Sequence, residues 1–424
     1  MGKIVLDINF VIMKPIFIYI LIIFTLLTSA CSKNEPEVVV PVQMTLIYAV
    51  NNSSLSSDLT SNENGMLDAM KNVDTQKYKL LLYKYHSDGP VLYEAVNRNG
   101  DVRFEAVKHY DNSIPSIDRD RIADVINDAL GMYPDVSANL FFWGHGLGWV
   151  NKYKYSDNVR LSSVNLESSN IWSKELTENH AFGGEYVTDI NGIRTTEFID
   201  IDRLAEVIPD NSFDLIWFDC CYMSSIEVVY QLRNKCKTFV GYPTEILAEG
   251  LPYHKVLPYL VSGAPDYMKA ADALYNYYSG TSSKSNPVTV AVLDMTKIED
   301  VANASRAVFA LGESRPLTGV LQNYSTFRDI RYYDFGQYMR EYADVNSKAD
   351  ATKAEIADKA IKYLQSALSS FVIYANASAY DFSYPSKPIS KENYSGLSIY
   401  NYLDINSPRA DYYRSLDWYK RVWK

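Results

Sequence analysis

The chain has 424 residues, of which 47% are hydrophobic and 22% are charged, and its formal net charge is −10. This composition is that of an ordinary globular protein, and the lack of a strongly basic stretch argues against nucleic acid as a partner. Apart from Cys31, the only cysteines are Cys220, Cys221 and Cys236, which are too few for a disulfide framework and leave at least one free thiol.

The N-terminal segment has the pattern of a bacterial lipoprotein signal. Residues 16–27 are almost all apolar, Lys14 precedes them, and small residues lead to Cys31. The apolar run is shorter than the about 20 residues that a membrane span needs. We therefore expect residues 1–30 to be a lipoprotein signal peptide, with Met13 as an alternative start, and Cys31 to be lipidated. An ordinary cleaved signal peptide and an uncleaved anchor are the alternatives.

Residues 32–37 are polar and helix-poor, which predicts that residues 31–42 form a short tether to the membrane. The protein would then be lipid-anchored in the cell envelope, and the sequence leaves open which face of the membrane it occupies. We expect a catalytic core over residues 43–294 and a C-terminal region over residues 295–424.

The core and the C-terminal region alternate between strand and helix patterns. Strands are predicted at 44–50, 78–83, 102–107, 138–143, 213–218, 238–241 and 288–293, and helices at 116–131, 201–208, 224–233, 266–278, 296–311 and 356–371. Ser116 is the predicted N-cap of the first helix, and Ile356, Tyr363 and Phe371 belong to the predicted apolar face of the last. The alternation predicts an α/β fold with a mostly parallel sheet flanked by helices and a C-terminal subdomain. Residues 151–195 are polar and predict a long surface insertion.

Two of the predicted strands end in reactive side chains. The run that ends at Trp143 is followed by Gly144, His145 and Gly146, and the other run ends in Asp219, Cys220 and Cys221. Open α/β sheets place their functional groups at the carboxyl ends of neighbouring strands. An imidazole and a thiol that meet there can form a nucleophile and its base, so the two runs together predict a cysteine peptidase.

The pattern around the thiol predicts further geometry. Residues two apart share one side of a strand, so Asp219 and Cys221 should point the same way and Cys220 the other way. Asp219 would suit a pocket for a cationic side chain. Ser224 and Glu227 form a capping-box pattern, which would place the thiol near a helix N-terminus and stabilise its thiolate by about 1 kcal/mol. The amides of Gly146 and Cys221 could form a two-donor oxyanion hole.

The other histidines and cysteines lack the spacing of metal ligands, and we predict no metal site and no cofactor. We expect structural or surface roles for Cys220, Cys236, His86, His109, His180 and His254.

At this point the motifs resemble those of the clostripain family of cysteine peptidases, in the clan that holds caspases, gingipains and legumain. The segment 142–149 resembles the family's histidine motif, and the segment 218–228 resembles its cysteine motif, with Cys220 where alanine is usual. Weaker similarities occur at 250–253, 333–336 and 396–400.

The resemblance implies a caspase-like fold with Cys221 as the nucleophile and His145 as the general base and acid. It places Asp219 in the pocket for the residue before the scissile bond (P1), with preference for Arg or Lys there, and Glu249 on a substrate-binding loop. It also implies self-cleavage between the histidine and the cysteine, for which residues 151–195 are the expected place. Some relatives need calcium, and the sequence, which has no EF-hand loop, leaves that requirement open.

Three functions follow from these patterns. The favoured one is a surface-anchored endopeptidase that cleaves protein or peptide substrates after Arg or Lys. A second is a catalytically silent lipoprotein that binds peptide or glycan. A third is a peptidase with acidic or Asn specificity at P1, and an acidic P1 is disfavoured because its charge would meet Asp219.

Overall fold

The fold is taken from a computed structural model of the whole chain. It describes residues 39–150, 182–188, 192, 194–279, 287–312, 317, 319–325, 331–382, 387–400 and 408–423. The predicted signal peptide, Cys31, most of the tether and residues 151–181 of the predicted insertion lie outside the described residues. Pro41–Lys424 forms one compact unit. None of the helices in the described ranges is long and apolar enough to cross a membrane.

The described residues form the following elements in chain order. The strands are β1 (Gln43–Ala49), β2 (Tyr78–His86), β3 (Gly89–Arg98), β4 (Asp101–His109), β5 (Ser137–Trp143), β6 (His145–Gly146), β7 (Phe182–Thr188), β8 (Arg194–Ile199), β9 (Phe213–Asp219), β10 (Cys236–Gly241), β11 (Thr289–Asp294), β12 (Tyr332–Asp334), β13 (Val372–Ala377) and β14 (Ser398–Tyr400). The α-helices are α2 (Ser56–Met70), α3 (Arg119–Met132), α4 (Ile201–Val207), α5 (Ile226–Gln231), α6 (Tyr253–Val256), α7 (Tyr267–Ser279), α8 (Ile298–Phe309), α9 (Phe335–Ser347), α10 (Ala351–Phe371), α11 (Pro408–Ser415) and α12 (Asp417–Trp423). Two short 3₁₀ helices are η2 (Leu257–Tyr259) and η3 (Met295–Lys297).

Nine strands form one central sheet in the order β13-β11-β10-β9-β5-β1-β2-β3-β4. The five strands from β10 to β2 are parallel, and the two strands at each edge are antiparallel. The predicted α/β class and its parallel central strands are confirmed. Because parallel strands end at the same edge of a sheet, β1, β5 and β9 bring their following loops together.

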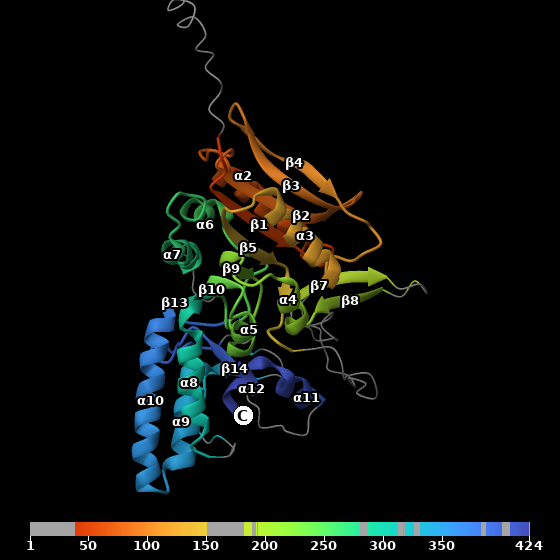
Figure 1. Ribbon diagram of the computed structural model, residues 1–424. Coiled ribbons are helices and arrows are strands. Elements are labelled where there is room, and N and C mark those ends of the chain that lie inside the picture. Colours follow the sequence, from red (N-terminus) through yellow and green to blue (C-terminus); the bar gives the residue numbers. More distant parts are fainter. Residues whose placement is uncertain are drawn as a thin grey trace, which may run out of the picture. The chain divides into compact units, whose positions relative to one another are not determined.

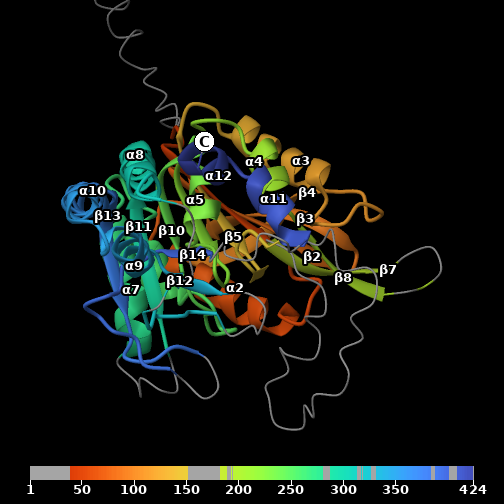
Figure 2. The same cartoon turned by 90° about the horizontal axis from the view of Figure 1, so that it is seen from below.

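The central sheet is covered on both faces (Figures 1 and 2). Figure 2 shows α2 and α7 on one side of the strands and α3, α4, α5 and α12 on the other. The side chains of β1 alternate between the two cores, with Leu46 and Tyr48 in one and Ile47 and Ala49 in the other. A strand buried on both faces has no polar side, which explains the continuous apolar runs that end at the reactive residues.

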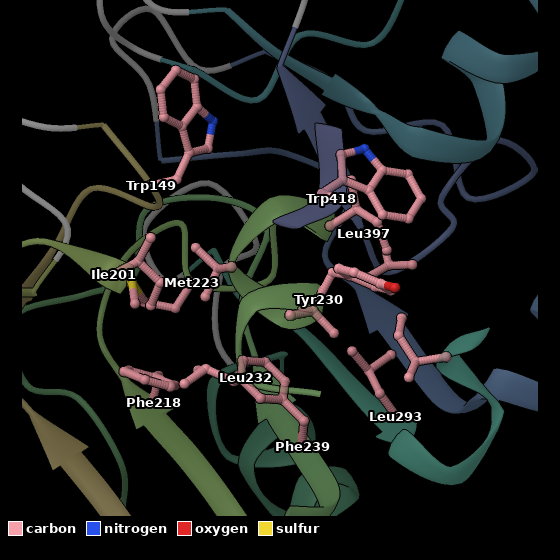
Figure 3. Packing of buried hydrophobic residues seen from close by; sticks show 14 of the residues in the cluster. Trp149, Ile201, Phe218, Met223, Tyr230, Leu232, Phe239, Leu293, Leu397 and Trp418 are labelled. Carbon is pink, nitrogen blue, oxygen red and sulfur yellow. The ribbon is translucent and has the colours of Figure 1, made fainter. Parts of the chain in front are cut away.

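The C-terminal region packs on the core behind the cysteine strand. Strand β13 completes the sheet beside β11, and β14 bridges to Ser225 just before α5. Figure 3 shows Trp418 beside Tyr230 of α5, and their ring centroids are 5.5 Å apart. The chain after residue 295 therefore contributes both a sheet edge and part of the core around the cysteine turn.

Local features differ from the sequence predictions at the N-cap of α3 and on the exposed face of α10. Asp118, and not Ser116, caps α3, because its carboxylate accepts hydrogen bonds from the first turn. Ser116 is instead buried and accepts hydrogen bonds from two tyrosine hydroxyl groups. Ile356 and Tyr363 are exposed on α10, whose buried face is made mostly of alanine and leucine.

Part of the predicted insertion is ordered structure. Strands β7 and β8 form a hairpin within residues 182–199, and β7 pairs with the short strand β6 that contains His145. The hairpin was not predicted because its strands are rich in glycine, threonine and charged residues and lack an apolar alternation.

Candidate active site

The ends of β5 and β9 bring His145 and Cys221 to the same edge of the sheet. The two strands are parallel neighbours, and Trp143 lies opposite Asp219 in their register. His145 and Cys221 each follow that pair by two residues. The main chains also touch, because a Cβ atom on Gly146 would lie 2.5 Å from the carbonyl oxygen of Cys221 and 3.2 Å from its amide nitrogen. Only glycine fits at this position.

The imidazole of His145 is held by a loop and by a strand from other parts of the chain. Its Nε2 atom lies 3.0 Å from Oγ of Ser54, in the loop after β1, and the two atoms share a hydrogen bond. Gly184 of β7 packs against the ring, where a Cβ atom would lie 2.4 Å from Cδ2. Burial lowers the pKa of His145 to about 4, because the charged imidazolium would lose hydration. At neutral pH the ring is therefore uncharged and able to accept a proton.

The thiol of Cys221 lies under the loop that follows β10. The amide of Ile246 donates to its Sγ atom over 3.4 Å, and Sγ lies 3.9 Å from the carbonyl oxygen of the same residue. Burial, followed by the negative charge of Glu245, raises the pKa of Cys221 to about 12. In this state the thiol is protonated at neutral pH, so its attack on a substrate requires a base that takes the proton.

The predicted stabilisation of the thiolate by a helix is wrong. Helix α5 begins only at Ile226, and Ser225 caps it by accepting from the amide of Val228. Ser224 donates its hydroxyl to the carbonyl oxygen of Gly396 instead, and Glu227 is turned towards the C-terminal region. The turn 221–224 separates the thiol from the helix, so the macrodipole, whose effect is confined to the first turn, does not lower its pKa.

The residue that follows the thiol has an unusual backbone conformation. Tyr222 has φ = +61°, and its amide donates to the carbonyl oxygen of Thr244 over 3.0 Å. A left-handed conformation costs a non-glycine residue roughly 1–2 kcal/mol, so the surrounding contacts must hold it. Such a turn reverses the chain directly after the strand and leaves Cys221 partly exposed at its tip.

Asp219 is buried and faces the same loop as the thiol. One carboxylate oxygen, Oδ2, accepts from the amide of Leu251 and from the hydroxyl of Tyr253, both over 3.1 Å. The other oxygen, Oδ1, is buried and has no hydrogen-bond partner among the residues that the structure describes. Burial raises the pKa of Asp219 to about 7. Cys220, between Asp219 and Cys221 in the chain, points to the opposite face, where its Sγ lies 3.3 Å from the carbonyl oxygen of Phe142.

Glu249 lies directly before Gly250, and Gly250 covers the carboxylate of Asp219. Gly250 has φ = +60°, and a Cβ atom there would lie 2.9 Å from Oδ2 of Asp219. The side chain of Glu249 is exposed, and its carbonyl oxygen accepts from Asn62 of α2. Its negative charge, together with burial, raises the pKa of Asp58. The loop over Asp219 thus carries acidic groups and faces a further one on α2.

The other two cysteines that the structure describes are both buried. Cys236 is a free, buried thiol on β10, and Cys220 is also free and buried. Within the described ranges, no three His, Cys, Asp or Glu side chains gather as a metal-binding group would require. The predicted lack of a cofactor stays a prediction.

Sequence reasoning missed three contributors to the site. Ser54 contacts the imidazole, Gly184 packs on it, and Ile246 contacts the thiol. A signal existed for Ser54, because it lies just after the first central strand and loops at that edge gather around the site. Gly184 and Ile246 belong to segments for which no sequence pattern predicted a position next to His145 or Cys221.

Comparisons with known proteins identify the family. The model of the clostripain family matches residues 189–423, which is more than half of the chain and includes Asp219 and Cys221. No curated protein matches the chain.

Solved structures show the same fold. A secreted C11 cysteine protease from Bacteroides thetaiotaomicron, in complex with an irreversible peptide inhibitor, is 26% identical, with a TM-score of 0.70; the match covers 91% of this chain and 100% of that one. An inactive zymogen C11 protease from Parabacteroides distasonis is 24% identical, with a TM-score of 0.69, over 91% of this chain and 99% of that one. The chain therefore belongs to the clostripain family and is a cysteine peptidase.

Proposed function

We propose that this peptidase is an endopeptidase that cleaves protein and peptide substrates after Arg or Lys. The observation that carries the proposal is the buried carboxylate of Asp219, which lies two residues before Cys221 and has one oxygen without a partner in the described part of the chain. A guanidinium or ammonium group offers the donors that this oxygen lacks and compensates its buried charge. Glu245 and Glu249 add negative charge to the covering loop, which favours a cation further.

The proposed reaction uses Cys221 and His145 in two half-reactions. The uncharged imidazole takes the thiol proton while Sγ attacks the scissile carbonyl, which forms the S–C bond. The amides of Gly146 and Cys221 donate to the oxyanion of the tetrahedral intermediate. The C–N bond then breaks as the imidazolium gives its proton to the leaving amine. Water, deprotonated by the same imidazole, attacks the thioester and releases the acid and the free thiol.

We also propose self-processing within residues 151–195, which lie between the histidine and cysteine motifs. The segment contains basic residues that suit the proposed specificity, among them Lys152, Lys154, Arg160, Lys174 and Arg194. Prolonged incubation of the purified protein should produce two fragments whose new termini follow one of these residues. A fully active protein that remains uncut, or a Cys221→Ala variant that is cut equally fast in isolation, would exclude this proposal.

The proposed location is the cell envelope, with a lipid on Cys31. Support comes from the apolar segment and the small residues that precede this cysteine. Metabolic labelling with a fatty-acid analogue should label the wild-type chain in its bacterial host and leave Cys31→Ala unlabelled. Equal labelling of both proteins, or of neither, would reject the anchor.

The specificity is tested with a peptide library that varies the P1 residue, under reducing conditions and with either calcium or a chelator. Cleavage after Arg or Lys is expected, and Cys221→Ala should abolish it while Cys220→Ala should preserve it. Cleavage after neutral or acidic residues only would refute the basic specificity. The calcium arm decides a requirement that the sequence leaves open. Membership in a peptidase family favours this function over a silent protein that binds peptide or glycan.

A further inference from the structure

Two turns hold the proposed catalytic residues, and both contact one buried side chain from the C-terminal region. Leu147 follows His145 by two residues, and Tyr222 directly follows Cys221. The side chain is that of Tyr332, the first residue of β12, which is fully buried.

The contacts of Tyr332 reach the two turns through different atoms. Its hydroxyl donates to the carbonyl oxygen of Leu147 over 2.9 Å. Its ring stacks on the ring of Tyr222, with centroids 5.6 Å apart and planes inclined by 23°. The hydroxyl therefore contacts the turn that follows His145, and the ring contacts the turn that follows Cys221.

The backbone of both turns is adapted to this side chain. Gly148 has φ = +75°, and a Cβ atom there would lie 2.3 Å from the hydroxyl oxygen of Tyr332 and 3.3 Å from the carbonyl oxygen of Tyr222. Tyr222 itself has the left-handed conformation described above. A strained conformation persists only where its surroundings fix it, and the stacked ring of Tyr332 is one such constraint.

Tyr332 is in turn fixed by groups that lie outside both turns. Strand β12 pairs with β14 (Figure 2), and Tyr332 lies opposite Tyr400 in the register of this pair. The carbonyl oxygen of Tyr332 accepts from the amide of Tyr324 over 2.8 Å. At the other end of β12, the buried carboxylate of Asp334 accepts from Ser395 and caps α9. These contacts fix the main chain of Tyr332 and therefore the position of its side chain.

We propose that Tyr332 is a positioning residue that sets His145 relative to Cys221. It does not touch the reacting atoms and acts through the main chains of the two turns. This role rests on the proposed function of His145 and Cys221. A displacement of about 1 Å between reacting groups can reduce a rate about 10²-fold, so a single hydroxyl at this junction is expected to affect turnover.

The test compares two substitutions that each remove one tyrosine hydroxyl. Tyr332→Phe keeps the ring and loses the hydrogen bond to Leu147. Tyr342→Phe is the matched control, because its hydroxyl donates to the carbonyl oxygen of Gly312 over 2.7 Å and its ring packs against Phe309 and Trp423. Tyr332→Phe should lower kcat about tenfold with KM within about twofold, because the position of the reacting groups and not substrate affinity is affected. Tyr342→Phe should leave both constants unchanged.

A second readout separates positioning from general destabilisation. Alkylation of Cys221 by iodoacetamide needs no peptide site, and at neutral pH it depends on proton transfer to His145. We expect Tyr332→Phe to slow it towards the rate of His145→Ala, with a changed pH profile, and Tyr342→Phe to react as the wild type. An alkylation rate and kcat equal to those of Tyr342→Phe would overturn the role, even if both variants lower Tm.

Gly148→Ala tests the same contact from the other side, and its kcat alone is informative if Tyr332→Phe does not fold. Its methyl group would meet the hydroxyl, so the variant should lose kcat as well, and the double variant should lose less than the product of the two single effects. Multiplicative effects would overturn the coupling. Failure of the proposed function looks different, since it would leave the Cys221→Ala or His145→Ala variant active.

Discussion

The buried carboxylates of Asp219 and Glu227 lie eight residues apart in the chain. They have the same kinds of hydrogen-bond partner, but we assign them different roles. In Asp219 one oxygen accepts from the amide of Leu251 and the hydroxyl of Tyr253, and in Glu227 one oxygen accepts from the amide of Tyr400 and the hydroxyl of Tyr413. In each carboxylate the second oxygen is buried and has no hydrogen-bond partner within the described ranges. Burial raises the pKa of both to about 7.

The difference between them lies in what covers each group. Asp219 is at the end of a central strand, and a loop with Gly250 and Glu249 covers it beside the thiol. Glu227 is on α5, and β14 and α11 cover it from the C-terminal region. A perturbed pKa therefore marks burial in both cases, and only position relative to the nucleophile distinguishes a candidate substrate group from a structural one.

The largest effect is expected from Asp219→Asn. The variant keeps the shape of the side chain and removes the charge that would pair with a basic P1 residue. Loss of one partner of a buried charge pair should lower kcat/KM for Arg and Lys substrates about 10²- to 10³-fold, as measured by steady-state hydrolysis. Asp214→Asn is the control, because it lies on the same strand and pairs with Lys237 away from the thiol. Equal kcat/KM values for Asp219→Asn and Asp214→Asn would contradict a role of Asp219 in substrate binding.

Glu227→Gln should change stability and leave catalysis nearly intact. The pKa of Glu227 rises from 4.5 to about 7 on folding, so the unfolded chain loses its proton first as the pH increases. The free energy of unfolding should therefore fall by about 3 kcal/mol between pH 4.5 and pH 7 through this group, and stay constant above. Urea unfolding at about pH 5 and pH 8 should show a smaller difference in Glu227→Gln than in the wild type.

Two results would contradict this assignment of Glu227. One is an unchanged pH dependence of stability in Glu227→Gln. The other is a loss of kcat/KM for basic substrates as large as that of Asp219→Asn. Asp219→Asn should also reduce the pH dependence of stability, because the pKa of Asp219 rises in the same direction. The pH dependence of the free energy of unfolding should therefore decrease in both variants, whereas kcat/KM for basic substrates should fall strongly only in Asp219→Asn.

The pH dependence of kcat/KM should identify Asp219 directly. The pKa of His145 is lowered to about 4 and that of Cys221 raised to about 12, so neither group titrates between about pH 5 and pH 9. Asp219 must be ionised to bind a cation, so kcat/KM for Arg substrates should fall about tenfold for each pH unit below about 7. A substrate with a neutral P1 residue and the Asp219→Asn variant should both lack this limb. A limb of equal size with the neutral substrate would assign the titration to another group.

The sequence predicted the parts of the site that follow from strand direction. Period-two alternation and apolar runs were sufficient to place His145, Cys221 and Asp219 at one sheet edge, and the opposite orientation of Cys220 followed from the same rule. The fold class followed from the alternation of strands and helices. These features depend on short-range geometry, which the local pattern determines.

The features that the sequence did not predict depend on long-range packing. Ser224 and Glu227 matched a capping box, yet Glu227 is directed to Tyr400, which lies 173 residues further along the chain. Ser225 caps the helix instead, so that α5 starts at Ile226 and the expected effect on the thiol is absent. Likewise, the pKa of Cys221 depends on the loop with Glu245 and Ile246, whose path over the thiol no local pattern specifies.

Gly250→Ala should have the smallest effect and tests the cover of Asp219 alone. The added methyl group would lie within 3.0 Å of both carboxylate oxygens, in a backbone conformation with φ = +60° that alanine adopts poorly. The loop must therefore move, which should raise KM for Arg substrates about fivefold and leave kcat nearly unchanged, because the thiol and imidazole keep their places. Gly100→Ala is the matched control, since its φ is +91° and its methyl group would enter open space. Both variants have the same kind of backbone strain, so a rise in KM in Gly250→Ala alone would assign the effect to the carboxylate contact, whereas equal values would assign it to strain and weaken the proposed role of the covering loop.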